Sequence, residues 1–93
     1  MNMQDLLNQA RKMQKEIDNK KNNLKNTDFT FEKQGISLVI SGGYEVKKIS
    51  IHPVLADPED IETLEDLILI TLNEALEKIN QENEKIMPNQ SGM

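Results

Sequence analysis

Residues 36–51 of the chain are Ile36-Ser37-Leu38-Val39-Ile40-Ser41-Gly42-Gly43-Tyr44-Glu45-Val46-Lys47-Lys48-Ile49-Ser50-Ile51. Apolar and polar residues alternate on both sides of the Gly-Gly pair, which is a strong hairpin signal because both glycines can adopt φ > 0. A turn of only two residues places Glu45 and Lys47 on the apolar face, so a longer turn or a β-bulge is an open alternative. This stretch therefore predicts two antiparallel strands and leaves their register open.

A further strand precedes this hairpin. Phe29 and Phe31 alternate with polar residues, and Gln34-Gly35 interrupts the pattern before Ile36. At the other end, His52-Pro53 terminates the last strand, because proline cannot donate a hydrogen bond to a neighbouring strand. The middle of the chain therefore predicts a small three-stranded antiparallel sheet.

The residues before the sheet have the periodicity of an α-helix. Their apolar residues follow the 3,4 spacing of one helical face, which Lys20 interrupts. The members of this face, called the seam below, are Met3, Leu6, Ala10, Met13, Ile17 and Leu24. A seam this narrow is expected to lie against a partner rather than to build a core.

The residues after the sheet predict a second, longer helix. Asp57 is placed to cap its N-terminus, Pro58 suits the first helical position, and acidic residues at positions 59 and 60 suit the positive end of the helix dipole. A helix from Pro58 to Ile86 is about 43 Å long at 1.5 Å per residue, so we expect its end to project. The predicted order is α-β-β-β-α, an α+β fold.

One part of this second helix points to a second copy of the chain. The run Leu67-Ile68-Leu69-Ile70 is apolar nearly all round, so it needs to contact more than its own sheet. Only 37% of the residues are hydrophobic, against about 45–50% in typical domains, so one chain has little material for a core. We therefore predict a homodimer, with an interface that includes Leu67, Ile68, Leu69, Ile70 and Leu72.

Length and composition exclude several classes of protein. The 93 residues allow one domain, which we place at residues 1–87 and expect to be followed by a disordered tail at residues 88–93. The absence of cysteine excludes a disulfide framework and a thiolate nucleophile. The longest apolar run is too short to cross a bilayer, and the N-terminus lacks the features of a signal peptide. We expect a soluble, cytoplasmic protein that does not bind membranes.

Signals for catalysis or for a bound metal are weak. His52 is the only histidine, and a single histidine at a strand end is typical of a structural or solvated residue. Asp57, Glu59 and Asp60 lack the spacing of a calcium loop, and helix capping explains them. Ser41-Gly42-Gly43 joins two strands, whereas a phosphate-binding loop precedes a helix. We therefore predict no catalytic residue, no metal, no cofactor and no small-molecule ligand.

Charge is divided unevenly along the chain. Residues 1–26 carry a net charge of +3, residues 27–53 carry none, and residues 54–93 carry −8, within a total of −5. A charged helix face often serves only to keep a helix solvated. With two Phe, one Tyr and no Trp, the chain lacks a stacking platform for single strands, so duplex phosphates are the expected ligand. The residues predicted to contact DNA are Arg11, Lys12, Lys15 and Lys25, with Asn8, Asn19 and Asn22 as neutral donors.

Several segments, taken in order, resemble the YbaB/EbfC nucleoid-associated protein family. They are Ala10-Arg11-Lys12-Met13-Gln14-Lys15-Glu16, the segment that begins at Gly35, the segment from Gly42 through Glu45-Val46 to Ile49-Ser50-Ile51-His52-Pro53, then Leu64-Glu65-Asp66-Leu67-Ile68 and Leu72-Asn73-Glu74-Ala75. The resemblance runs from about Met3 to Met87. It implies a homodimer with central strands and helices that project like tweezers. It also implies duplex DNA binding that alters DNA conformation, a place in the nucleoid, and roles in nucleoid organisation and gene expression.

The chain departs from the family pattern in two ways. His52 stands where family members commonly have Asp, which affects only a local turn. After Glu74 the only cations are Lys78 and Lys85, so DNA contacts through the second helix are expected to be weaker here. A second interpretation is therefore a dimeric protein-interaction module that grips another protein and has no physiological DNA contact. Steep salt dependence distinguishes phosphate binding from apolar helix docking.

Overall fold

The computed structural model describes residues 2–86. The elements are α1 (Met3–Lys25), β1 (Asp28–Lys33), β2 (Ile36–Ser41), β3 (Val46–Ile51), the short 3-10 helix η1 (Pro53–Leu55) and α2 (Ile61–Ile86). This order confirms the predicted α-β-β-β-α arrangement. The predicted disordered tail at residues 88–93 lies outside the described residues.

The three strands form one antiparallel sheet with β2 in the centre. The register of β3 shifts once: Val39 pairs with Lys48, whereas Ile40 pairs with Val46. Lys47 is therefore the extra residue of a β-bulge, which a strand accommodates by a local bend. The bulge answers the question of register that the sequence left open, because it places Val46 on the same side of the sheet as Ile40.

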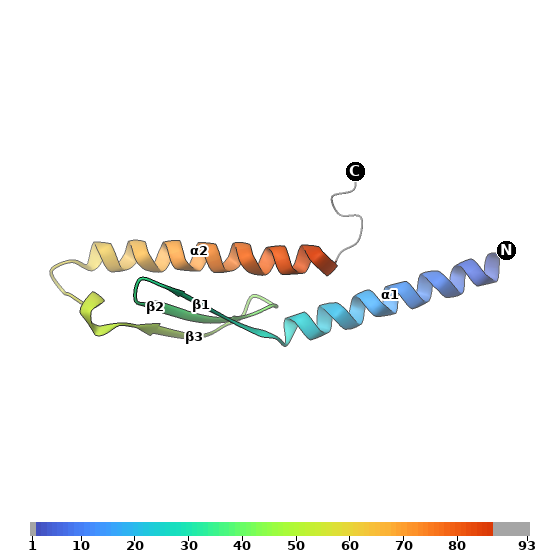
Figure 1. Cartoon of the computed structure of the whole chain (residues 1–93), viewed down its shortest axis with the longest axis horizontal. Coiled ribbons are helices and arrows are strands. Elements are labelled where there is room, and N and C mark those ends of the chain that lie inside the picture. Colours follow the sequence, from blue (N-terminus) through green and yellow to red (C-terminus); the bar gives the residue numbers. More distant parts are fainter. Residues whose placement is uncertain (1, 87–93) are drawn as a thin grey trace.

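The core lies between the central strand and the second helix. Ile36, Leu38 and Ile40 of β2 are buried beneath Ala75 and Ile79 of α2. The helix runs along one face of the sheet and packs over β2 and β1 (Figure 1). This core is small, in agreement with the low hydrophobic content of the chain.

The third strand is left uncovered on this face of the sheet. Val46, Ile49 and Ile51 pair with the three buried residues of β2, so they share the core side of the sheet. Their exposed fractions are nevertheless 51%, 48% and 36%. The reason is that α2 lies toward β1, where Lys33 forms an ion pair with Glu74 at 2.7 Å.

One residue of α2 extends this uncovered area. The hydroxyl of Tyr44, just before β3, donates a hydrogen bond to Asn80 Oδ1 at 3.4 Å, which identifies the side of α2 that faces β3. Leu69 precedes Asn80 by eleven residues, about three helical turns, and so lies on the same side of the helix. Leu69 is 58% exposed. We call Val46, Ile49, Ile51 and Leu69 the open apolar surface.

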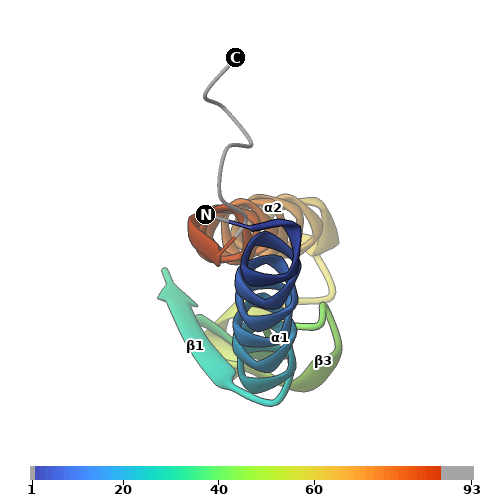
Figure 2. The same cartoon turned by 90° about the vertical axis from the view of Figure 1, so that its right-hand side faces the viewer.

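The first helix is the projecting element. It extends away from the sheet beyond the end of α2 (Figures 1 and 2), and none of its residues is buried. Ile17 and Leu24 of the seam are half-buried, whereas Met3 and Met13 are 73% and 57% exposed. We expected the end of the second helix to project, but α2 still contacts the rest of the chain at Asn83. The arm of the molecule is therefore α1.

The second helix begins later than predicted. Asp60, rather than Asp57, is placed as its N-cap, since Asp60 Oδ1 accepts a hydrogen bond from the backbone N–H of Thr63 at 3.3 Å. Asp57 Oδ1 instead accepts from Glu59 N–H at 2.9 Å, the pattern of an Asx turn. Because that turn uses the Asp57 side chain, the helix starts at Ile61 and the prediction of a cap at Asp57 is wrong.

Candidate functional site

The predicted DNA-binding residues all lie exposed on α1. At about 100° of rotation per residue, all of them except Lys25 fall within an arc of about 100° on the side opposite the seam. Lys25 lies about 40° outside this arc, in the last turn, beside the loop that joins β2 and β3. The set inside the arc, which we call the outer face, is Asn8, Arg11, Lys12, Lys15, Asn19 and Asn22.

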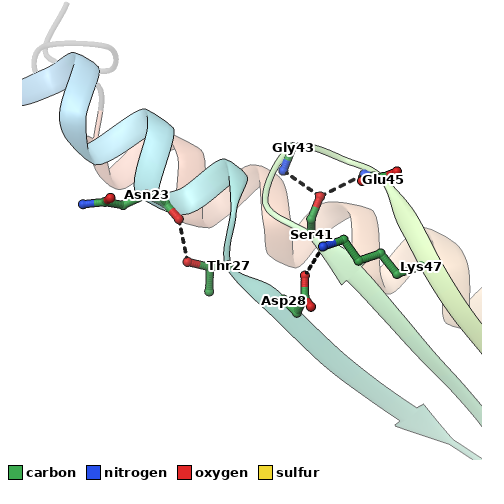
Figure 3. Close-up of polar contacts among 7 residues, drawn as sticks. All are labelled: Asn23, Thr27, Asp28, Ser41, Gly43, Glu45 and Lys47. Atoms are coloured by element: carbon green, nitrogen blue, oxygen red, sulfur yellow. Dashed lines mark hydrogen bonds and ion pairs between the residues drawn. The ribbon is translucent and has the colours of Figure 1, made fainter.

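Hydrogen bonds at both ends stabilise this sparsely packed helix. At the start, Asn2 Oδ1 accepts a hydrogen bond from the Asp5 N–H at 2.8 Å, which is the N-cap pattern. At the end, the Thr27 hydroxyl donates to the carbonyl of Asn23 at 2.7 Å (Figure 3). These local bonds compensate in part for the missing tertiary contacts, because caps satisfy backbone groups that a helix end leaves without partners.

Among residues 2–86, the cations of α1 differ from most others in having no acidic partner. In the described part of the chain, four ion pairs form between side chains: Lys33–Glu74 at 2.7 Å, Lys47–Asp28 at 3.0 Å, Lys78–Glu82 at 3.4 Å and Lys85–Glu82 at 3.0 Å. Within residues 2–86, no Lys or Arg of α1 takes part in an ion pair. With six Lys and Arg against three Asp and Glu, this exposed helix has a positive net charge, which attracts polyanions.

The two lysines of α2 instead both form ion pairs with one acidic residue. The hydrogen bond from Lys85 lowers the pKa of Glu82 below its ordinary value of 4.5, and the charge of Lys78 lowers it further. Glu82 is therefore ionised at neutral pH and bound to both lysines. This arrangement leaves α2 with little to offer a phosphate group, which agrees with the expectation from its sequence.

Some unpaired cations lie outside the predicted set. Lys20 and Lys21 are exposed on the seam side of α1, and Lys48 is exposed on β3. Within residues 2–86 they also have no acidic partner. Sequence reasoning left out the first two because it treated the seam side as covered, whereas most of that side is open. The positive net charge of α1 was the feature of the sequence that could have revealed them.

The structure divides the residues predicted for the dimer interface into two groups. Leu67, Ile68 and Leu72 are partly buried and pack against the core. Leu69 and Ile70 are 58% and 45% exposed, so these two have apolar surface available for another chain. The open apolar surface adds the three β3 residues, which the sequence analysis missed. Their spacing was misleading because a β-bulge interrupts the alternation.

Other kinds of site find little support. His52 Nδ1 accepts a hydrogen bond from the backbone N–H of Val54 at 3.2 Å and so caps η1. Over residues 2–86, no group of three or more His, Asp or Glu side chains is arranged to hold a metal ion. In that same part of the chain, no helix is both long and apolar enough to cross a membrane.

Together these features define a small α+β protein. One helix packs on a three-stranded sheet, and the other, basic helix projects from the sheet as an arm. The chain belongs to the YbaB/EbfC DNA-binding family, whose model matches residues 1–93. This is a DNA-binding family and not an enzyme family.

Similar proteins agree with this assignment. A nucleoid-associated protein of Mycoplasmopsis pulmonis is 50% identical over 86 residues, which cover 92% of this chain and 86% of that protein. A nucleoid-associated protein of Clostridium acetobutylicum is 39% identical over 93 residues and covers 98% of this chain and 83% of its own length. The crystal structure of an uncharacterized protein from Helicobacter pylori is similar with a TM-score of 0.75, over 92% of both chains, at 20% identity. The last likeness supports the fold alone.

Proposed function

We propose that this chain binds duplex DNA as a homodimer, through the outer face of α1, with little sequence preference. It contributes in this way to nucleoid organisation and gene regulation. The folded unit is a single domain over residues 1–87. The observation that carries the proposal is the set of α1 cations that have no acidic partner among residues 2–86, together with the membership of a DNA-binding family.

The chemistry of the outer face favours phosphate groups over bases. Lys, Arg and Asn side chains donate hydrogen bonds to phosphate oxygens, and such contacts position a protein without reading sequence. Stacking on successive bases needs several exposed aromatic rings, but Phe29 and Phe31 pack against the core and Tyr44, which is 47% exposed, is the one ring that remains. Duplex DNA therefore suits this surface better than a single strand.

The open apolar surface supports the homodimer. Val46, Ile49, Ile51 and Leu69 are between 36% and 58% exposed, and an exposed apolar patch of this kind is typical of an interface. The relatives named as nucleoid-associated proteins are of similar length. A dimer presents the outer face of α1 twice, so it can contact one duplex at two places and alter its conformation.

A salt titration tests the role of the outer face. If about four to six phosphates are neutralised, log affinity falls against log salt with a slope of about −4 to −5. The double variant Lys12→Gln/Lys15→Gln is expected to flatten the slope by about 0.9 for each phosphate group that is no longer neutralised. The weakening is expected to be similar on unrelated DNA sequences.

The matched control is Lys78→Gln/Lys85→Gln, which removes the same charge from lysines that are bound to Glu82. It is expected to change the slope less. Equal slopes in the two double variants contradict the assignment to α1. Absence of duplex binding by the unaltered protein at about 20 mM salt, where screening is weak, contradicts DNA binding as a whole.

One observation favours the alternative of a protein-interaction module. Met3, Leu6 and Met13 of the seam are 73%, 49% and 57% exposed, and an apolar helix face can dock in the groove of a partner. The acidic back of the molecule is also poorly suited to DNA. Capture of a partner protein that persists at high salt, combined with absent duplex binding, supports this alternative.

A further inference from the structure

Gly42 lies where three segments of the chain meet. Its N–H donates a hydrogen bond to the carbonyl of Thr27, directly after α1, at 2.9 Å. Its own carbonyl accepts from Asn83 Nδ2 of α2 at 3.3 Å, and the same amide group donates to the carbonyl of Ile79 at 3.0 Å. The loop between β2 and β3 is therefore connected both to the base of the arm and to the second helix.

The base of α1 lies directly against this glycine. A Cβ atom at position 42 would overlap the backbone carbonyl of Leu24 and would lie 2.7 Å from its side-chain Cγ. Gly42 does not have a positive φ, unlike Gly35, so the close approach of α1 is what excludes a side chain. At the neighbouring Gly43 a Cβ would meet only the Lys25 side chain closely, at 2.7 Å from Cγ.

The loop that supports α1 is itself braced. The buried Ser41 hydroxyl oxygen accepts hydrogen bonds from the N–H groups of Gly43 and Glu45, both at 3.2 Å. Beside it, Lys47 of the bulge forms an ion pair with Asp28 of β1 at 3.0 Å (Figure 3). The loop on which the arm rests is therefore held by hydrogen bonds of its own, so we expect a change at Gly42 to displace the arm rather than the loop.

We propose that Gly42 and Asn83 are positioning residues for DNA binding, which set the direction of α1 and so the place of its outer face relative to the sheet. The proposal rests on the proposed function, since it explains how the arm is aimed. The 23 residues of α1 make a helix of about 35 Å, so a tilt of about 10° at its base moves its tip by about 6 Å. That displacement is close to two phosphate spacings of about 3.4 Å along one strand.

Distances between two spin labels test the direction of the arm. The chain has no cysteine, so Gln9→Cys on α1 and Asn73→Cys on α2, both exposed, give one label on each helix. Mixing the labelled chain with an excess of unlabelled chain prevents distances between labels on two different chains from contributing. A single narrow distance distribution is expected for the unaltered protein, a shifted one for Gly42→Ala, and little change for the control Gly43→Ala.

Asn83→Ala provides a second variant that introduces no overlap. It is expected to broaden the distribution, while Gln81→Ala, at an exposed position of α2, leaves it unchanged. A broad distribution in the unaltered protein overturns the proposal, and so does a distribution that is neither shifted in Gly42→Ala nor broadened in Asn83→Ala.

A salt titration on the same variants tests the consequence for DNA. Variants that unfold cooperatively but have a displaced arm are expected to have a slope flatter by about 0.9 for each phosphate group that α1 no longer neutralises, a change that lower stability alone does not produce. An unchanged slope despite a displaced arm overturns the positioning role. Failure of DNA binding in the unaltered protein contradicts the proposed function. The direction of the arm is tested independently of that result, because the label distances are measured without DNA.

Discussion

At the scale of single residues, short polar side chains decide where the two helices begin and end. Asn2 caps α1 and Asp60 is positioned to cap α2, each by accepting a hydrogen bond from the N–H three residues later. Thr27 closes the far end of α1 by a hydrogen bond to the carbonyl of Asn23. Asn2 and Thr27 matter more than usual because few apolar contacts stabilise the first helix.

The cap at Asp60 leads to a direct test. Asp60→Ala is expected to lower the free energy of unfolding by about 1 kcal/mol, within the range of about 0.5–2 kcal/mol for loss of an N-cap. Asp57→Ala is expected to cost less, because it removes only a turn hydrogen bond outside the helix. Urea denaturation of both variants measures the difference. A larger destabilisation by Asp57→Ala contradicts the assignment of the cap.

Sequence reasoning could not distinguish these two aspartates. Asp57 precedes a proline and two acidic residues, which is a favourable pattern for a helix start. The side chain of Asp57 instead bonds to Glu59 within a separate turn, a local competition that the pattern does not reveal. By contrast, the Gly42-Gly43 hairpin was predictable, since alternation on both sides of two glycines has few other solutions.

At the scale of elements, the two helices differ in how much of their length is packed. Thr71, Ala75 and Ile79 of α2 are buried against the sheet, whereas α1 has no buried residue. The α1 cations were predictable because charge and helical period are both visible in the sequence. The sequence could not show which half of the seam is covered, because that depends on the direction in which α1 extends from its contact with Gly42.

Amide hydrogen exchange is expected to reflect this difference. Protection of α2 around Thr71 and Ile79 is expected to exceed that of the first half of α1 by about 100-fold or more, because buried contacts must break before the amides open. Exchange measured residue by residue by NMR provides the comparison. Equal protection in residues 3–13 of α1 means that this part of the arm is covered in solution, by a partner copy or by another chain.

At the scale of the whole molecule, one chain is far from compact. Its radius of gyration is 19.3 Å and its principal extents are 71 × 26 × 13 Å, while a compact domain of this length has a radius of gyration of about 12 Å. A shape this extended, with an open apolar surface beside its core, suits one half of a larger assembly. The low hydrophobic content already pointed to a dimer, but the β3 residues became visible only once the position of α2 over β1 was known.

The proposed dimer predicts a concentration-dependent stability. Light scattering of the unaltered protein at micromolar concentration is expected to give twice the chain mass of 10.6 kDa, with a thermal midpoint that rises with concentration. Ile49→Gln/Leu69→Gln is expected to shift the mass toward one chain. These side chains are about half exposed in one chain, so the fold of the chain should survive the change.

The control for this experiment is Met3→Gln/Met13→Gln, which changes two exposed side chains of the arm. It is expected to leave the mass at two chains. Dissociation by this control alone places the interface on the seam instead of the open apolar surface. A folded wild-type monomer, with a midpoint independent of concentration, contradicts the homodimer.

The separation of charge along the chain has a consequence for the approach to DNA. Six of the eleven Lys and Arg residues lie on α1, whereas α2 carries seven Asp and Glu residues against two Lys, so the elongated chain has a permanent electric dipole moment. In the field of a polyanion such a molecule experiences a torque that turns the arm toward the DNA before contact, and steering of this kind acts on the association rate. The acidic helix then helps to exclude wrong orientations, so the −5 net charge slows the encounter less than it would on a uniformly charged sphere.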